Sequence, residues 1–372
     1  MSLATVVSLL LGSCLLGLAL RTGERRRRAP PLPPADPCGP RPPGNDVTVL
    51  VPMRNEEHNA IPCVESLLAQ TAGPLVRVID DGSTDATGTL VAARAAGEPR
   101  LSLVAAGPLA EGWRGKPHAL WVGSRDVRSP WLLLTDADTR HHPETLARTR
   151  SAAEKGGLEA VSLAGWQEAR GAGENLLIPP VFALLDTFLG SWEAAADGSG
   201  PPVANGQLIL LQREAWERAG GFPTVRAETL DDVAIVRRLR EAGGRTAFIR
   251  APDLLQVRMY QGTREAVHGW RRNLGGLFGG RPGTVAAILA VLLAPPLVLA
   301  AELLTGHWLA AALLWCAGTA ASALLRSSSG HVPAWALLFP GDSLVLAAVL
   351  VLGVRDRRHG RLTSWKGREI KV

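Results

Sequence analysis

Three groups of acidic residues in this 372-residue chain could place carboxylates around a ligand. They are Asp80-Asp81-Gly82-Ser83-Thr84-Asp85, Asp136-Ala137-Asp138 and Asp231-Asp232. The first two directly follow apolar runs typical of buried strands, and the third opens a helical pattern. Since ligands of doubly wound sheets gather at the carboxyl ends of strands, we expect a binding site there.

Asp136 and Asp138 have the spacing that lets two carboxylates face one divalent cation. Mg²⁺ and Mn²⁺ are usually held by a few carboxylates together with phosphate oxygens. Leu132-Leu133-Leu134 would form the strand that delivers both acids to one edge. The alternatives are structural: turn or capping acids in the first two groups, and favourable helix N-terminal charge for Asp232.

Other common sites have no sequence signature here. GxGxxG after the first strand and GxxxxGK[ST] are both absent, so a dinucleotide-binding domain and a P-loop NTPase are unsupported. The chain also lacks HExxH and GxSxG. Its four cysteines form neither a zinc-binding pattern nor a disulfide framework.

The central part of the chain alternates strand and helix patterns. Strands are predicted at 47–51, 75–79, 101–104 and 131–134, with helices at 61–68, 84–96 and 116–126 between them. Further strands are predicted at 159–163, 204–211 and 246–249, with a helix at 229–242. This order predicts an α/β fold with a doubly wound, mostly parallel sheet.

Apolar residues make up 47% of the chain and concentrate at its ends. Residues 2–20 have the length of a spanning helix, and Arg25 to Arg28 follow at once. The positive-inside rule then puts the N-terminus outside and the following domain in the cytoplasm, as in a multi-pass plasma-membrane protein. The net charge of +6 comes from basic clusters beside apolar segments, which indicates a membrane surface and no nucleic acid.

The C-terminal apolar segments pose a conflict. Segments 284–304, 308–325 and 334–354 would put the basic tail outside, whereas its charge favours the cytoplasm. We therefore expect two to three C-terminal transmembrane helices, with 284–304, broken at Pro295-Pro296, re-entrant or interfacial. The predicted domains are a 1–21 anchor, a 22–45 basic and Pro-rich linker, a 46–280 catalytic domain, 281–354 membrane segments and a 355–372 basic cytoplasmic tail.

Several motifs together resemble the family 2 glycosyltransferases, which have a GT-A fold. The segments that carry the resemblance, in order, are Val51-Pro52-Met53-Arg54-Asn55-Glu56-Glu57, Ile79-Asp80-Asp81-Gly82-Ser83-Thr84-Asp85, Thr135-Asp136-Ala137-Asp138, Gly220-Gly221-Phe222 and Leu230-Asp231-Asp232. Similarity to the membrane-bound branch linked to hopanoids and carotenoids rests on Gly112-Trp113-Arg114-Gly115-Lys116, Asn205-Gly206-Gln207, Val257-Arg258-Met259-Tyr260, Gly269-Trp270-Arg271-Arg272-Asn273 and Ser364-Trp365-Lys366-Gly367-Arg368.

The resemblance implies a nucleotide-sugar site. Pro52, Arg54 and Glu56 would lie against the nucleoside, Asp81 would contact the base, commonly uracil, and Lys116 would approach the diphosphate. The further residues that the resemblance assigns to this site are Asp136, Asn205, Trp270 and Arg271.

The resemblance also implies the metal and the catalytic base. Asp138 would hold Mn²⁺ or Mg²⁺, with Asp136 assisting near the ribose. Asp232 would be the catalytic base, and Asp231 stands where the family usually has Glu.

The expected reaction is an inverting, metal-dependent transfer of one sugar from a nucleotide-diphosphate sugar, such as a UDP-sugar, to a membrane lipid or polyprenoid. Processive members carry QxxRW, but this chain reads Val267-His268-Gly269-Trp270-Arg271. The alternatives are a processive polysaccharide synthase, an inactive membrane scaffold that binds nucleotide, and a nucleotidyltransferase. An amphipathic stretch with Trp270, Leu274, Leu277 and Phe278 is a candidate interfacial entry for the acceptor.

Overall fold

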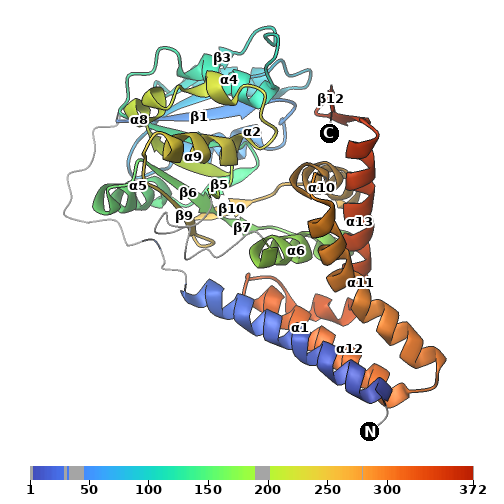
Figure 1. The fold of residues 1–372 in the computed structure, drawn as a ribbon. Coiled ribbons are helices and arrows are strands. Elements are labelled where there is room, and N and C mark those ends of the chain that lie inside the picture. The colour runs from blue at the N-terminus through green and yellow to red at the C-terminus, as the bar shows by residue number, and fades with distance from the viewer. Residues whose placement is uncertain (1–2, 29–31, 33–45, 189–201, 279, 372) are drawn as a thin grey trace. The chain divides into compact units, whose positions relative to one another are not determined.

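The computed structural model describes residues 3–28, 32, 46–188, 202–278 and 280–371 (Figure 1). The chain divides into two compact units. The sheet unit comprises Ala29–Trp166 and Trp192–Met259, and the helical unit comprises Met1–Arg28, Gln167–Ser191 and Tyr260–Val372. Most of the predicted linker, 29–31 and 33–45, lies outside the described residues.

The sheet unit is built on a seven-stranded sheet of order β3-β2-β1-β4-β8-β6-β9. Its strands are β1 (Val47–Met53), β2 (Leu75–Asp80), β3 (Leu101–Ala105), β4 (Trp131–Thr135), β6 (Ala160–Ala164), β8 (Leu208–Gln212) and β9 (Thr246–Arg250). Neighbouring strands are parallel, except that β8 is antiparallel to both β4 and β6. The predicted doubly wound, mostly parallel sheet is therefore confirmed.

Helices cover both faces of this sheet, as the near-continuous apolar runs of its strands require. One face packs against α2 (Ala60–Leu68), α3 (Thr87–Ala95) and α5 (Thr145–Gly156). The other packs against α4 (Gly115–Ser124), α8 (Arg213–Arg218), the 3₁₀ turn η1 (Phe222–Val225) and α9 (Asp231–Glu241).

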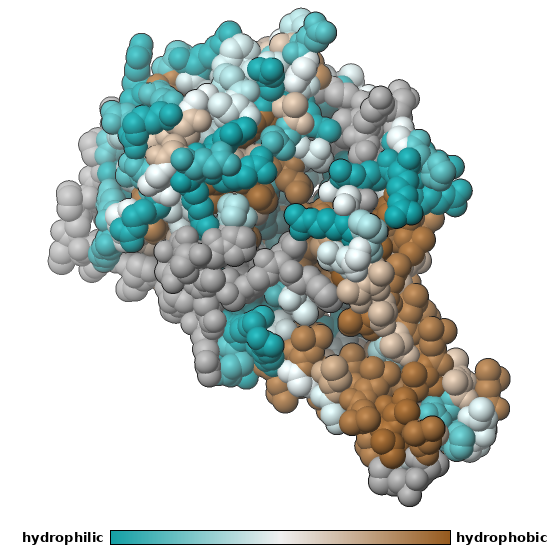
Figure 2. Space-filling view, viewed as in Figure 1, coloured by the Kyte–Doolittle hydropathy of each residue, from teal (hydrophilic) through white to brown (hydrophobic). Residues whose placement is uncertain are grey.

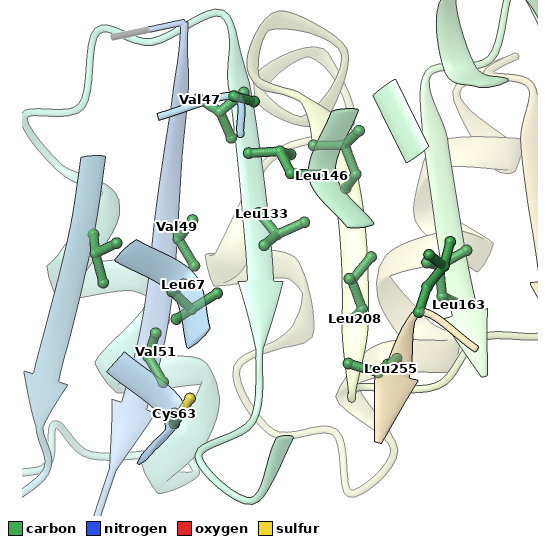
Figure 3. Close-up of a cluster of buried hydrophobic side chains, with 14 of the residues drawn as sticks. Val47, Val49, Val51, Cys63, Leu67, Leu133, Leu146, Leu163, Leu208 and Leu255 are labelled. Atoms are coloured by element: carbon green, nitrogen blue, oxygen red, sulfur yellow. The ribbon is translucent and has the colours of Figure 1, made fainter. Parts of the chain in front are cut away.

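Successive side chains of one strand enter opposite cores, since side chains alternate across a sheet. Val49 and Val51 lie in the first core, where Figure 3 shows them with Leu133 and Leu208. Leu50 between them lies in the second core. A small sheet of order β5-β10-β7, formed by β5 (Thr139–His141), β10 (Leu255–Val257) and β7 (Trp166–Gln167), follows the loop at Asp136–Asp138.

The helical unit contains six α-helices among its described residues. They are α1 (Leu3–Arg28), α6 (Gly171–Phe188), α10 (Thr263–Phe278), α11 (Pro282–Leu304), α12 (Trp308–Ser327) and α13 (Gly341–Arg358), followed by the hairpin β11 (Leu362–Trp365) and β12 (Arg368–Lys371). The 3₁₀ helix η2 (Pro333–Leu338) lies between α12 and α13. Figure 1 shows α1 and α12 running side by side.

Three helices in the described part of the chain are long and apolar enough to cross a membrane: Leu3–Arg27, Pro282–Leu304 and Trp308–Ser327. The expectation that 284–304 is broken is wrong, because α11 continues through Pro295 and Pro296. Segment 334–354 is instead the weak candidate, because it is split between η2 and α13. The apolar part of α13 is also short, because Asp342 lies in its first turn and three arginines lie in its last turn.

The first helix extends beyond the predicted anchor and includes Arg25 to Arg28. Arg26 is buried, and its Nε donates a 2.7 Å hydrogen bond to Asp186 of α6. A buried arginine needs such a partner because removing an isolated charge from water is costly. This ion pair therefore joins α1 to α6 within the helical unit.

The apolar face of α10 is not the free interfacial surface that the sequence predicts. Trp270, Leu274 and Phe278 are 3% exposed or less, and α10 packs against α13 and α6. Residues 260–280, which the sequence analysis placed in the catalytic domain, belong to the helical unit. Packing within this unit takes up the face that would otherwise meet the bilayer.

Glycines allow α10 and α13 to approach closely at their crossing. A Cβ at Gly275 would lie 2.5 Å from the carbonyl oxygen of Gly353.

Gly275→Val is therefore expected to lower the free energy of unfolding by about 1–3 kcal/mol and Tm by roughly 2–10 °C. The measurement is thermal unfolding of the full chain in detergent, with Gly17→Ala as control, since Gly17 has open space. Equal Tm values for both variants would show that this crossing is loosely packed.

Candidate active site

The candidate site lies at the carboxyl edge of the sheet, where the strand order reverses. From β1 the chain adds β2 and β3 on one side and then returns to place β4 on the other. Such a reversal leaves a crevice outside the strand ends. Arg54 follows β1 and Asp136 follows β4, so the two predicted halves of the site flank this crevice.

The antiparallel strand β8 brings a further segment to the same edge. Thr135, at the end of β4, pairs with Leu208, at the start of β8. The preceding Asn205-Gly206-Gln207 therefore lies beside the Asp136–Asp138 loop. Asn205 is held there by its own hydrogen bonds, because its N–H donates to Ser162 Oγ at 2.9 Å and its Nδ2 donates to Gln207 Oε1 at 3.0 Å.

Lys116, in the first turn of α4, lies among the acids that the sequence singled out. Its Nζ is 2.7 Å from Asp136 Oδ1 and 3.7 Å from Asp231 Oδ2. Burial alone would lower the pKa of Lys116, but the charges of Asp136, Asp231 and Asp232 outweigh burial and raise it. Lys116 therefore remains a cation at the meeting point of β4 and α9.

Asp232 has the environment of a general base. Its Oδ2 accepts a 2.9 Å hydrogen bond from the Gly206 N–H, and its Oδ1 accepts one of 2.8 Å from its neighbour Val233. Burial and the neighbouring Asp231 raise the pKa of Asp232 to about 6, although Lys116 opposes them. A carboxylate with this pKa is ionised at neutral pH and is a better proton acceptor than an ordinary aspartate.

The pKa of Asp231 is raised, as is that of its neighbour Asp232. Burial raises its pKa, Lys116 lowers it, and Asp136 raises it again. Perturbed carboxyl groups of this kind gather at functional sites more often than elsewhere. The pair thus shares one cation between two half-buried acids.

Gly206 leaves the space that Lys116 occupies. A Cβ at position 206 would lie 2.6 Å from Lys116 Nζ and 3.5 Å from Asp136 Oδ2. The glycine therefore allows the ammonium, the Asp136 carboxylate and the backbone N–H that binds Asp232 to meet.

A buried polar network that the sequence analysis missed supports the Asp136–Asp138 loop. Thr139 Oγ1 donates to the Asp136 carbonyl at 2.7 Å, and Thr135 Oγ1 donates to the Gln207 carbonyl at 2.7 Å. His141 Nε2 lies 3.1 Å from the Thr135 hydroxyl and 3.0 Å from the Thr139 hydroxyl. Burial and Arg140 lower the pKa of His141 to about 3, so its ring is neutral. Isolated Thr and His residues give no sequence signal for such a network.

Asp136 and Asp138 supply oxygen ligands of the type that Mn²⁺ and Mg²⁺ prefer. Asp136 has a side chain that is 32% exposed and can reach a ligand, and Asp138 is half-buried. No group of three or more His, Cys, Asp or Glu side chains among the described residues could hold a metal ion. Because such ions are commonly held by one or two carboxylates plus substrate phosphates, the pair fits a metal that arrives with the diphosphate.

The other half of the crevice contains the residues predicted to meet the nucleoside. Arg54 donates from Nη1 to the carbonyl oxygens of Asp81 and Gly82, the latter at 2.9 Å. The Asp81 N–H donates to the Met53 carbonyl at 2.9 Å, and Asp81 is 4% exposed. These contacts join the ends of β1 and β2 into one surface.

Pro52 and Glu56 complete this surface. Pro52 pairs with Ile79 across β1 and β2. The Glu56 N–H donates to Thr87 Oγ1 at 2.8 Å, while its carboxylate accepts a 3.0 Å hydrogen bond from Asn59. The structure thus places all four predicted nucleoside residues at the ends of two adjacent strands.

Trp270 and Arg271 belong to the helical unit, unlike the other predicted donor residues. Trp270 is buried in edge-to-face contact with Phe182, with ring centroids 5.5 Å apart. Arg271 Nη2 pairs with Asp356 Oδ2 at 2.5 Å. Both have structural partners inside their own unit, and their part in donor binding stays a prediction.

Comparison with solved structures identifies the fold. A mannosyltransferase from Pyrobaculum calidifontis, PcManGT, solved in complex with GDP-Man and Mn²⁺, superposes with a TM-score of 0.55 at 22% identity, over 95% of this chain and 98% of that one. That likeness shows the fold, which is the GT-A fold of glycosyltransferases.

The sequence comparisons show similarity to one family of glycosyltransferases. Residues 48–177 match the model described as Glycosyl transferase family 2. The 4,4'-diaponeurosporenoate glycosyltransferase of Staphylococcus aureus strain MRSA252 is 26% identical over 257 residues, which are 65% of this chain. The match covers 64% of that relative's length. The predicted resemblance to the family 2 glycosyltransferases, and with it the predicted enzyme class, is confirmed by the family model, the named relative and the shared fold.

The position of Lys116 can be tested through Gly206. Gly206→Ala fits the backbone but places a methyl group against the ammonium, which must then shift from its place beside Asp136. Because small displacements in an active site can cost up to about 10²-fold, turnover of a nucleotide-sugar donor is expected to fall by about tenfold or more. Gly97→Ala, which meets no neighbouring atom, is the control. Full turnover by the Gly206 variant would mean that Lys116 need not lie between the acids.

Proposed function

We propose that this chain transfers a single sugar from a nucleotide-diphosphate sugar to a membrane lipid, with inversion at the anomeric carbon. The observation that carries the proposal is Asp232, a carboxylate with a pKa of about 6 held by the Gly206 N–H. Lys116 and Asp136 lie beside it in the same unit. A base and a cation at the end of a GT-A sheet are the parts that such a displacement requires.

The reaction proceeds by direct displacement. The acceptor hydroxyl oxygen forms a bond to the anomeric carbon while the bond from that carbon to the diphosphate breaks. Asp232 takes the hydroxyl proton, and the diphosphate leaves with the electron pair. Lys116 supplies fixed positive charge toward the departing group, which helps most where water is excluded.

Asp138 and Asp136 would hold the divalent metal. When bound, Mn²⁺ or Mg²⁺ neutralises charge that develops on the leaving diphosphate. PcManGT, which shares the fold, is named with Mn²⁺ and GDP-Man. For this chain the proposed donor is a nucleotide-diphosphate sugar, and the uridine base implied by the family resemblance is one arm of a donor panel.

The proposed acceptor is a lipid or polyprenoid. Three helices of the described chain have the length and apolarity to span a membrane. The curated relative is named for a carotenoid acid, diaponeurosporenoate. Both observations favour an acceptor that enters from the bilayer.

The proposed topology places the sheet unit in the cytoplasm. With α1, α11 and α12 crossing and α13 remaining inside, the sheet unit and the basic end of α13 lie on the same side. Three crossings therefore remove the conflict between the number of segments and the charge of the tail.

Asp232→Asn tests the catalytic base. Because an amide cannot accept the acceptor proton, sugar transfer is expected to fall about 10²–10⁴-fold. Donor affinity, measured by titration calorimetry with nucleotide and Mn²⁺, is expected to change little. Asp253→Asn, at an exposed aspartate outside the acid cluster, is the matched control. Unchanged transfer by Asp232→Asn would reject the assignment.

The pH dependence of transfer gives a second test. Since the pKa of Asp232 is raised to about 6, the base is protonated and inactive below that pH. We expect kcat/KM to rise about tenfold per pH unit on the acid side and to level off above about pH 6. Lys116 lowers the pKa of Asp232, so in Lys116→Gln the acid limb should move to higher pH. A profile without an acid limb would argue against Asp232 as the base.

A further inference from the structure

An apolar pocket of about 130 Å³ lies inside the helical unit, among α1, α6, α11, α12 and α13. Leu18, Ala183, Leu292, Ala321 and Leu346 contribute one lining side chain from each of these helices. No residue placed in the catalytic machinery above lines it. The pocket is therefore a separate feature of the fold.

Prolines inside two helices line this pocket. They are Pro179 and Pro180 of α6 and Pro295 of α11. A proline inside a helix lacks the N–H that would bond the carbonyl four residues earlier. For Pro179 that carbonyl belongs to Asn175, and Arg326 of α12 donates to it from Nη1 at 2.9 Å. Arg326 thus replaces the hydrogen bond that Pro179 removes.

The same arginine fixes a polar end of the pocket. Arg326 and Asp342 are 2% and 5% exposed, and Arg326 Nη2 lies 3.4 Å from Asp342 Oδ2. Ser322 donates to that same carboxylate oxygen at 3.1 Å. These contacts tie α12 to α6 and α13. Because removing one partner of a buried ion pair is costly, this pair stabilises the packing of α12 against α13.

The surroundings of the pocket identify the kind of occupant. Three of its five helices, α1, α11 and α12, are long and apolar enough to span a membrane. Figure 2 shows hydrophobic surface gathered over this part of the helical unit. A pocket among membrane-spanning helices is accessible to lipid chains. Its lining is mostly apolar, and a polar solute would find charged hydrogen-bonding partners only at the end formed by Arg326 and Asp342.

We propose that this pocket binds the hydrocarbon chain of the lipid acceptor. The inference rests on the proposed function, because it assumes that the acceptor is a lipid. Because the pocket walls are already packed against one another, binding a chain requires little further ordering of the protein. Each methylene buried contributes roughly fourfold in affinity, so occupation of this pocket favours long-chain acceptors over short ones.

Photolabelling of the full chain in nanodiscs tests the pocket directly. The probe is an isoprenoid alcohol with a diazirine at the chain end, and the sites of labelling are read by mass spectrometry. We expect label at Ala321 and Leu325, and its loss in the presence of excess unlabelled isoprenoid alcohol. Label spread over exposed residues such as Leu304, Trp308 and Leu309, without competition, would overturn the proposal.

Matched variants test the role of the pocket in binding. Ala321→Phe fills the pocket, whereas Ala320→Phe adds the same ring on the exposed face of the same helix. If the ring displaces two methylene groups, the pocket variant should bind the probe roughly fifteenfold more weakly. Ala183→Phe fills the pocket from α6 and should act alike. Equal binding by all three variants would also overturn the proposal.

Donor hydrolysis separates failure of this inference from failure of the proposed function. If wild type and both pocket variants hydrolyse the donor but only wild type transfers sugar efficiently to long-chain lipid, both proposals hold. If the pocket variants turn over the donor and transfer sugar to lipid as well as wild type does, the proposal for the pocket is contradicted and the proposed function is not. Competed labelling of the pocket without any donor turnover would contradict the proposed function alone.

Discussion

The ion pair between Lys116 and Asp136 is the interaction on which the site depends. At 2.7 Å it joins the start of α4 to the end of β4, and Asp231 of α9 lies 3.7 Å from the same ammonium. Three carboxylates in a half-buried cluster repel one another, and Lys116 offsets that repulsion. The cation therefore keeps Asp232 ionised at neutral pH while burial keeps its pKa high enough for proton transfer.

Much of this arrangement follows from the sequence. Apolar runs such as 131–134 predict buried strands, and strand ends then predict where Asp81 and Asp136 lie. The family resemblance added Lys116 and the catalytic role of Asp232, without the contacts of either residue. The sequence could not show that β8 enters antiparallel, because its apolar run has no direction. That reversal is what brings Gly206 to Lys116 and Asp232.

The errors concern helices in the C-terminal third of the chain. Hydropathy alone favours 334–354 as a span, but charges at both ends of α13 leave too short an apolar core. Pro295 and Pro296 do not break α11, and both are buried within the helical unit. The apolar face of α10 finds its partner in α13 through the close approach at Gly275. Each outcome depends on tertiary packing, which periodicity does not encode.

Product mass is the most direct test of the central claim that this site joins one sugar to a membrane lipid. The full chain, reconstituted in membranes of its host, is incubated with Mn²⁺ and a panel of labelled UDP- and GDP-sugars, with Asp232→Asn as the blank. We expect a labelled lipid heavier than its precursor by one sugar residue, absent from the blank. A labelled polymer, or a labelled lipid formed equally by the Asp232 variant, would contradict it.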